Sequence, residues 1–237
     1  MTARHVLDPQ WAGCPPHQNP IRIFLRLNRK IFNPAGESDG VGYIPVSLRS
    51  NSGTKTFATD PDDSVDAAVI LVNARTIAAE YEIDGVPISL FPTDEEAETR
   101  KKSGIGEEIL SAGLLPTFPG VRRNYPFFKF GNISNIPDEP IEVPCAPGEP
   151  PRLLRLWFIA ANLVPGNSGS PIFLVPPGAG GIVLGAGRPM LLGLQSISFS
   201  GSDVAGMTSA RFIFEIIESM SIGDADLHRG VVEQKQK

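Results

Sequence analysis

Leu163–Pro171 reads LVPGNSGSP and joins two apolar runs, 156–161 and 172–175. Short apolar runs bounded by glycine and proline are typical of strands, so this stretch predicts a tight turn inside a β-rich fold. Glycine on either side of Ser168 permits backbone conformations in which neighbouring N–H groups converge on one point. The same residue types dominate ordinary surface turns, so this stretch alone leaves a catalytic turn and a plain loop open.

Composition narrows the class of protein. The 237 residues are 41% hydrophobic, enough to bury one large core or two modest ones. The 26 acidic residues outnumber the 21 basic ones without a long basic run, so nucleic acid is not an expected partner. Two cysteines and three scattered histidines predict neither a metal site nor a disulfide framework, and leave a bond between Cys14 and Cys145 open. We expect no cofactor, and no apolar run approaches the ~20 residues that span a bilayer.

Turn residues are spread along the whole chain. The 24 glycines and 23 prolines favour short strands cut by turns over long helices. Residues 21–27 alternate apolar and polar side chains with period 2, as a half-buried strand does. Further strands are predicted at 41–48, 67–72, 86–91, 108–113, 126–133, 153–161, 171–175, 182–184 and 191–197.

Three segments depart from the strand pattern. Residues 94–102 are highly charged and predict a surface helix that links two halves of the chain. Residues 137–151 contain six prolines and predict an extended loop. Residues 211–220 place four apolar side chains on one helical face and predict an amphipathic helix.

The spacing of these elements predicts an all-β fold. Short strands followed by one closing helix indicate two antiparallel β-barrels in sequence. We expect the first barrel over 1–93, an inter-barrel link over 94–103, and the second barrel with its closing helix over 104–222. The polar tail, 223–237, is expected to be disordered.

Two polar residues upstream of Ser168 occur in contexts that suit catalysis. A serine hydroxyl is a poor nucleophile unless a base accepts its proton and preorganised donors bind the oxyanion. His5 lies between small and apolar residues, and Asp66 lies where an acidic turn enters the apolar run 67–71. An aspartate at that place can orient an imidazole base. Asp63 is a close rival for the same role.

Three motifs follow one another along the chain: Thr2–Val6 (TARHV), Asp66–Val69 (DAAV) and Gly166–Pro171 (GNSGSP). Together they resemble the signatures of the trypsin-like serine peptidases with the chymotrypsin fold, and most closely the bacterial members with few disulfides. The resemblance covers the chain from His5 to about Met220. It implies two barrels of the six-stranded type and a C-terminal helix.

The resemblance also implies a role for each motif. His5 is the expected general base and acid, Asp66 the carboxylate that orients it, and Ser168 the nucleophile that forms an acyl-enzyme. The N–H groups of Gly166 and Ser168 are the expected oxyanion donors. The implied activity is that of a serine endopeptidase, which hydrolyses peptide bonds in a peptide or protein substrate.

A substrate-binding surface is implied as well. Ser196, Ile197 and Ser198 fall in the strand that pairs with the substrate backbone, and the Ser196 hydroxyl is expected to support the catalytic carboxylate. Asn162 falls near the floor of the pocket for the substrate side chain, and Gly206 falls in its wall. Because Asn162 is neutral, a preference for lysine or arginine has no counter-charge.

The start of the chain departs from the family pattern. In the family, the strands that open the first barrel precede the histidine motif, and here only residues 1–4 precede His5. We therefore expect an incomplete first barrel, and Met1 to be an internal start or the edge of a truncation. An alternative function follows, namely a catalytically silent protease-like module that binds peptides or partner proteins along the strand edge 196–198.

One competing triad exists in the sequence. Ser168, Asp224 and His228 occur in the order used by the α/β-hydrolases. That fold needs Gly-x-Ser-x-Gly between a strand and a helix, whereas here Ser170 holds the fifth position and Pro171 blocks a helix. The sequence therefore disfavours this triad.

Overall fold

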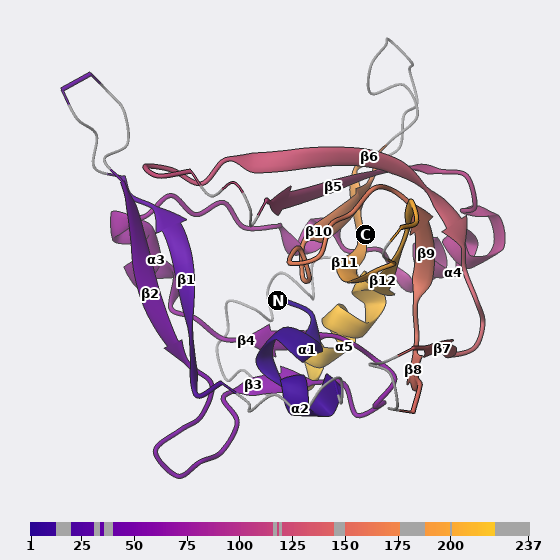
Figure 1. Cartoon of the computed structure of the whole chain (residues 1–237), viewed down its shortest axis with the longest axis horizontal. Coiled ribbons are helices and arrows are strands. Elements are labelled where there is room, and N and C mark those ends of the chain that lie inside the picture. The colour runs from indigo at the N-terminus through magenta and orange to yellow at the C-terminus, as the bar shows by residue number, and fades with distance from the viewer. Residues whose placement is uncertain are drawn as a thin grey trace.

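The structure, a computed structural model, describes residues 1–12, 20–30, 34–35, 40–115, 118, 120–144, 150–175, 188–199 and 201–220. Its main feature is a closed antiparallel barrel of six strands in the order β10-β11-β12-β9-β6-β5 (Figure 1). These strands are β5 (Glu108–Leu114), β6 (Pro126–Asn135), β9 (Trp157–Ala160), β10 (Pro171–Leu174), β11 (Met190–Ser198) and β12 (Val204–Ser209). The barrel lies where the sequence predicts the second of two.

Apolar side chains fill the barrel. Ile109, Ile133, Ile159, Ile172 and Met207 come from five different strands, and each is at most 1% exposed. Alternate residues of a strand point to opposite faces, so each strand sends one row of side chains inward. Burying one such side chain contributes about 1.5–3 kcal/mol. The packed barrel thus gives a rigid frame to the serine-containing turn, which joins β9 to β10.

The N-terminal half is built from two small sheets. β1 (Arg22–Asn28) pairs with β2 (Val41–Ser47), and β3 (Phe57–Thr59) pairs with β4 (Ala68–Ile70), both antiparallel. In the described part of the chain these strands form two separate two-stranded sheets and do not close a second barrel. Of the two expected barrels the structure shows one, the closed barrel of the C-terminal half, and a first barrel is not shown.

Limited apolar packing accounts for the open half. Leu7, Leu48 and Ala68 form a small buried cluster between the two sheets. On the outer surfaces of β1 and β2, Phe24 is 59% exposed and Tyr43 is 60% exposed. With so little apolar surface buried, the two sheets lack the continuous core that a closed barrel requires.

Helix α5 (Ala210–Ser219) joins this half to the barrel. Ile213 and Ile216 are at most 1% exposed and pack in one cluster with Val65 beside β4 and Leu191 of β11. In Figure 1 the helix lies between the β3–β4 sheet and the barrel. The predicted amphipathic helix is confirmed, and it fixes the segment around residue 66 relative to β11.

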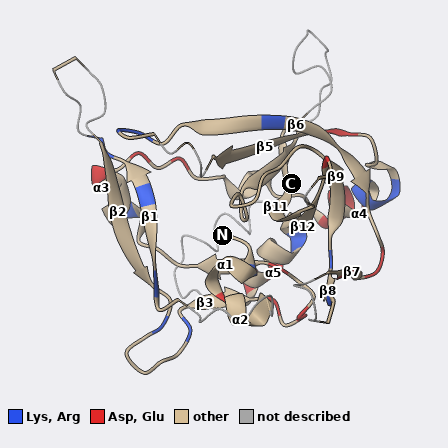
Figure 2. Ribbon diagram, viewed as in Figure 1, with Lys and Arg blue, Asp and Glu red and all other residues tan. Residues whose placement is uncertain are grey.

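The charged segment also forms a helix, α4 (Asp94–Ser103). The Thr93 side chain accepts from the Glu96 amide and the Glu96 side chain accepts from the Thr93 amide, which is a capping box. Acidic residues occupy its first turn and basic residues its last, and both arrangements are favourable to the helix dipole (Figure 2). The predicted surface helix is confirmed, and its role as a link between two domains stays a prediction.

Several local predictions differ from the structure. Residues 86–91 were expected as a strand, yet they contain the 3-10 helix η1 (Ile88–Leu90), because Pro87 lacks the amide hydrogen that a strand would use. Residues 153–161 divide into β8 (Arg152–Leu154) and β9, and β8 pairs with β7 (Ile141–Val143). The prediction of an extended loop over 137–151 is wrong in part, because that segment contains β7. The sequence analysis also missed β3, β12, α1 (Arg4–Leu7), α2 (Pro9–Ala12) and α3 (Ala74–Glu80).

Other predictions lie outside the described residues. These are the strand 182–184, the tail 223–237, Cys14, Cys145, Asp224 and His228. Among the helices that the structure does describe, none has the length and apolar character needed to cross a membrane.

Candidate active site

The first part of the site is a histidine held against a carboxylate. Thr2 pairs with Ala68 of β4 through two backbone hydrogen bonds of 3.0 and 2.9 Å. This pairing brings the first turn of the chain beside Asp66, which lies 61 residues further on. His5 Nδ1 lies 2.8 Å from Asp66 Oδ2, and the His5 amide donates to Asp66 Oδ1 at 3.0 Å. One residue therefore engages both carboxylate oxygens.

This arrangement fixes the orientation of the imidazole. The Asp66 side chain is 3% exposed and that of His5 is 30% exposed, so only the ring reaches solvent. A carboxylate accepts hydrogen bonds and does not donate them, so Nδ1 is the donor in this contact, and in the neutral imidazole Nε2 is then the acceptor. The rival Asp63 is 85% exposed and pairs instead with Arg4 at 3.1 Å.

The turn before Asp66 is tied to the barrel half. Asp62 accepts from the Ser64 amide and hydroxyl and from Arg155 Nε at 2.8 Å, while the Arg155 amide donates to the Ser64 carbonyl. The hydrogen bonds from Ser64 and then from Arg155 lower the pKa of Asp62 to about 2. These contacts anchor the turn from which Asp66 extends.

The serine turn forms the second part of the site. Gly166 and Gly169 have φ angles of 91° and 89°, a backbone region that favours glycine. Gly169 also lies against Thr2, so closely that a Cβ there would lie within 3.0 Å of the Thr2 Cα. Its amide donates to the Gln195 carbonyl of β11 at 2.8 Å. The turn is therefore held between the segment that carries His5 and strand β11.

The amides of this turn fall into two groups. Those of Asn167, Gly169 and Ser170 each donate to a backbone carbonyl. Those of Gly166 and Ser168 donate to no acceptor in the described part of the chain. These two are the amides expected as oxyanion donors, and a pair of free N–H groups in a glycine turn can bind a developing negative charge.

Ser168 and His5 are not hydrogen-bonded to each other in this structure. Ser168 is partly exposed and makes no hydrogen bond to His5 or to any other described residue. Catalytic hydrogen bonds in substrate-free enzymes are often long and tighten when substrate binds. The structure thus brings the three motifs together through Thr2 and Gly169 without closing the link between nucleophile and base.

A cleft of about 300 Å³ opens beside the imidazole. His5 and Asp66 lie on one side of it, and Ser196 and Ile197 of β11 lie on another. Arg152 at the start of β8 also lines it, and this residue was not foreseen from the sequence. Nothing local distinguishes Arg152 from other arginines, because its place in the cleft depends on the pairing of β8 with β7.

Ile197 and Ser198, two of the residues expected to bind substrate, lie on strand β11. Ile197 pairs with Gly206 and Ser198 pairs with Ala205 of β12. Strand β10 pairs with β11 only as far as Leu194, so within the described residues the other edge of 196–198 has no strand partner. Ser196 and Ile197 of this edge line the cleft, and an unpaired strand edge can accept an extended peptide.

Ser196 differs from its expected role. Its hydroxyl lies 2.6 Å from the Thr208 hydroxyl and makes no hydrogen bond to Asp66. The register of β11 against β12 shifts between Gln195 and Ile197, which is the irregularity that carries this side chain toward β12. Support of the carboxylate by Ser196 is therefore not seen, and His5 supplies both hydrogen bonds to Asp66.

Asn162 and Gly206 lie apart from the cleft. Asn162 is exposed, and its carbonyl accepts from Lys129 Nζ at 2.7 Å. A Cβ at Gly206 would lie 2.8 Å from Ile197 Cγ2 and 2.9 Å from Leu156 Cδ1, so glycine there leaves room for these side chains. Neither residue lines the cleft that holds His5.

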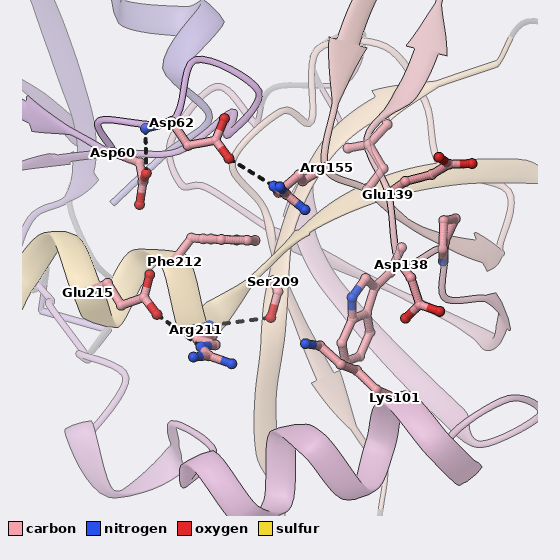
Figure 3. Close-up of a pocket in the computed structure, with 13 residues that line it drawn as sticks. Asp60, Asp62, Lys101, Asp138, Glu139, Arg155, Ser209, Arg211, Phe212 and Glu215 are labelled. Atoms are coloured by element: carbon pink, nitrogen blue, oxygen red, sulfur yellow. Dashed lines mark hydrogen bonds and ion pairs between the residues drawn. The ribbon is translucent and has the colours of Figure 1, made fainter.

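A second, larger cavity of about 410 Å³ lies between the 60–62 turn, α4 and α5 (Figure 3). None of the residues predicted for the site lines it. Its cations are paired within the chain, Arg155 with Asp62 and Arg211 with Glu215. No histidine is among the described residues that line this cavity, so the candidate site is the smaller cleft that contains His5 and Asp66.

Comparisons with known proteins identify no family. A scan against protein-family models finds no match, and a search of curated proteins finds none. Within the described ranges, no group of three or more His, Cys, Asp or Glu side chains is arranged to hold a metal ion. The fold and the site define a protein with a β-barrel, a partly exposed histidine on a buried aspartate, and a glycine–serine turn that contacts the same N-terminal segment.

Proposed function

We propose that this chain is a serine endopeptidase of the trypsin-like type. His5 and Asp66 supply the base and its orienting carboxylate, and Ser168 supplies the nucleophile. The N–H groups of Gly166 and Ser168 supply the oxyanion donors. The finer fold assignment, a chymotrypsin-like pair of barrels divided at the 94–103 link, belongs to the same proposal.

The observation that carries the proposal is the double hydrogen bond between His5 and Asp66. A buried carboxylate costs free energy unless it is well hydrogen-bonded, and here one histidine satisfies both of its oxygens. The His5 side chain is 30% exposed, so part of the ring stays accessible to solvent. Such a pair suits proton transfer better than a purely structural role, because its imidazole is not fully buried.

The reaction follows from these positions. Ser168 Oγ attacks the scissile carbonyl while its proton moves to His5 Nε2, and the carbonyl oxygen becomes an oxyanion at the Gly166 and Ser168 amides. The C–N bond then breaks as the proton passes from Nε2 to the leaving amine. Water then attacks the acyl-enzyme while His5 Nε2 accepts its proton. The acyl C–O bond breaks as that proton passes to Ser168 Oγ, which releases the acid product and restores the serine.

A second candidate function is a silent module that binds peptides. Two observations on the described residues favour it: Ser168 and His5 are not hydrogen-bonded to each other, and the edge of β11 at residues 196–198 opposite β12 has no strand partner. Such a protein would bind an extended peptide by strand addition without cleaving it.

A labelling experiment separates the two candidates. The purified chain is treated with a fluorophosphonate, and peptide hydrolysis is measured in parallel. We expect covalent labelling at Ser168, and we expect Ser168→Ala to lose about four to six orders of magnitude in kcat.

Ser170→Ala is the matched control, because it removes a hydroxyl from the same turn and leaves the proposed nucleophile in place. We expect this variant to label and to hydrolyse peptide. Peptidase activity that survives Ser168→Ala would overturn the assignment. A wild-type chain that binds peptide but is neither labelled nor active would favour the silent module.

A further inference from the structure

Arg152 is a partly exposed arginine that lines the cleft. Its guanidinium makes no hydrogen bond or ion pair with any residue that the structure describes. Two other arginines, in contrast, each form an ion pair: Arg4 with Asp63 and Arg155 with Asp62. Arg152 is only partly exposed, and burial lowers the pKa of its guanidinium. Asp66 and Asp63 attract this charge without forming an ion pair with it. A partly buried cation without a directly bonded carboxylate is costly, and an incoming anion would offset that cost.

The side chain is held by aromatic stacking. The guanidinium carbon of Arg152 lies 3.8 Å from the centroid of the Trp11 ring, and that of Arg4 lies 4.3 Å from the same ring. Trp11 itself packs against the buried cluster of Val143 and Leu154. Stacking occupies the face of a guanidinium and leaves its edge N–H groups available for hydrogen bonds.

Asp66 is not the missing partner. Both of its carboxylate oxygens already accept from His5, and its influence on Arg152 is a longer-range attraction. The Arg152 guanidinium therefore lies in the same cleft as the His5 ring, and its N–H groups have no acceptor among the described residues. A guanidinium matches a carboxylate, which it binds through two parallel hydrogen bonds.

We propose that this cleft binds an acidic side chain of the substrate and that Arg152 is the residue that selects it. The proposal rests on the proposed peptidase function. A substrate segment paired with the free edge of β11 at 196–198 would point alternate side chains into the cleft. A glutamate or aspartate at one such position would meet the Arg152 guanidinium.

The test compares substrates that differ only in charge. A peptide library carries glutamate or glutamine at each position in turn, and kcat/KM is measured for each pair. At one position we expect the wild type to prefer glutamate at least tenfold. Arg152→Gln should bring that ratio close to one through a loss of kcat/KM on the glutamate peptide, and Arg152→Glu should make the glutamine peptide the better substrate.

Arg49→Gln is the matched control for the loss of one positive charge. Arg49 donates to the Gly53 carbonyl in an exposed turn away from the cleft, so this variant should keep the glutamate preference. The fluorophosphonate labelling rate of every variant reports on Ser168 independently of the peptide. A labelled wild type that shows no preference for glutamate at any position would overturn the specificity proposal and leave the peptidase proposal standing.

A binding experiment tests the role of Arg152 without requiring that the chain cleave peptides. Ser168→Ala is titrated with the same glutamate and glutamine peptides by calorimetry, with and without Arg152→Gln. Tighter binding of the glutamate peptide that disappears in the double variant supports the role of Arg152 even where labelling fails. Equal binding of both peptides overturns it.

Discussion

At the scale of single residues, the site depends on contacts between residues that lie far apart along the chain. His5 meets Asp66 because two backbone hydrogen bonds place Thr2 beside Ala68. The serine turn meets the same segment because Gly169 has no side chain and approaches Thr2 closely. One threonine thus contacts both halves of the proposed machinery.

Gly169→Ala tests this close approach. A methyl group at position 169 would be strained by the φ of +89° and would also collide with Thr2. We expect a loss of about 1–3 kcal/mol in the free energy of unfolding, together with a fall in fluorophosphonate labelling. Urea denaturation and the labelling rate check these expectations.

Gly53→Ala provides the comparison for that variant. Its φ is +85° and a Cβ there would meet nothing within 4 Å, so it carries the backbone cost without the collision. Equal destabilisation of the two variants would show that the contact with Thr2 is unimportant.

At the scale of elements, helix α5 holds the two parts of the site in register. Its apolar face contacts Val65, next to Asp66, and Leu191 of β11, which also carries the cleft residues. The helix therefore couples the position of the carboxylate to that of the strand expected to bind substrate. Movement of α5 would separate them.

Ile213→Ala tests this coupling. Ile213 is fully buried at the centre of the contact, so truncation to alanine leaves a cavity. We expect the free energy of unfolding to fall by about 2–5 kcal/mol, measured by urea denaturation. Ile217→Ala, at a partly buried position of the same helix, should cost less. A larger effect at Ile217 would contradict this account of the helix.

At the scale of the whole molecule, an ion pair joins the N-terminal half to the barrel half. Asp62 in the turn before Asp66 accepts from Arg155, which lies between β8 and β9. Figure 3 shows the pair at the edge of the larger cavity, where the two halves face each other. The strength of this link depends on the charge of Asp62.

Asp62 predicts how stability depends on pH. Its pKa is about 2 in the folded chain and about 3.9 in an unfolded one, so its stabilising effect is complete above about pH 4. The effect is lost as the pH falls from about 4 to about 2. Asp62→Asn should be less stable than the wild type at pH 6, and the difference should shrink toward pH 2.5.

Urea denaturation at both pH values measures that difference. Asp138→Asn is the control, because Asp138 lines the same cavity and is without an ion pair to any described residue. It should follow the wild type at both pH values. A difference between Asp62→Asn and the wild type that stays constant with pH would contradict the role of the ion pair.

The sequence by itself determined the local elements. The period-2 pattern predicted β1, apolar runs bounded by turn residues predicted the strands on both sides of Ser168, and one apolar helical face predicted α5. It missed α3, whose signal is the Asn73 side chain that caps it by accepting from the Thr76 amide. The order of the three motifs was enough to single out His5, Asp66 and Ser168 as candidates.

Only the tertiary structure decided which of these residues meet. The hydrogen bonds of His5 to Asp66, the pairing of Ser196 with Thr208 and the place of Arg152 in the cleft all join residues far apart along the chain. A periodic pattern reports which face of an element is apolar, because that depends on neighbouring residues alone. Which elements then pack together depends on the whole set of buried surfaces and backbone pairings, and no local stretch of sequence contains that information.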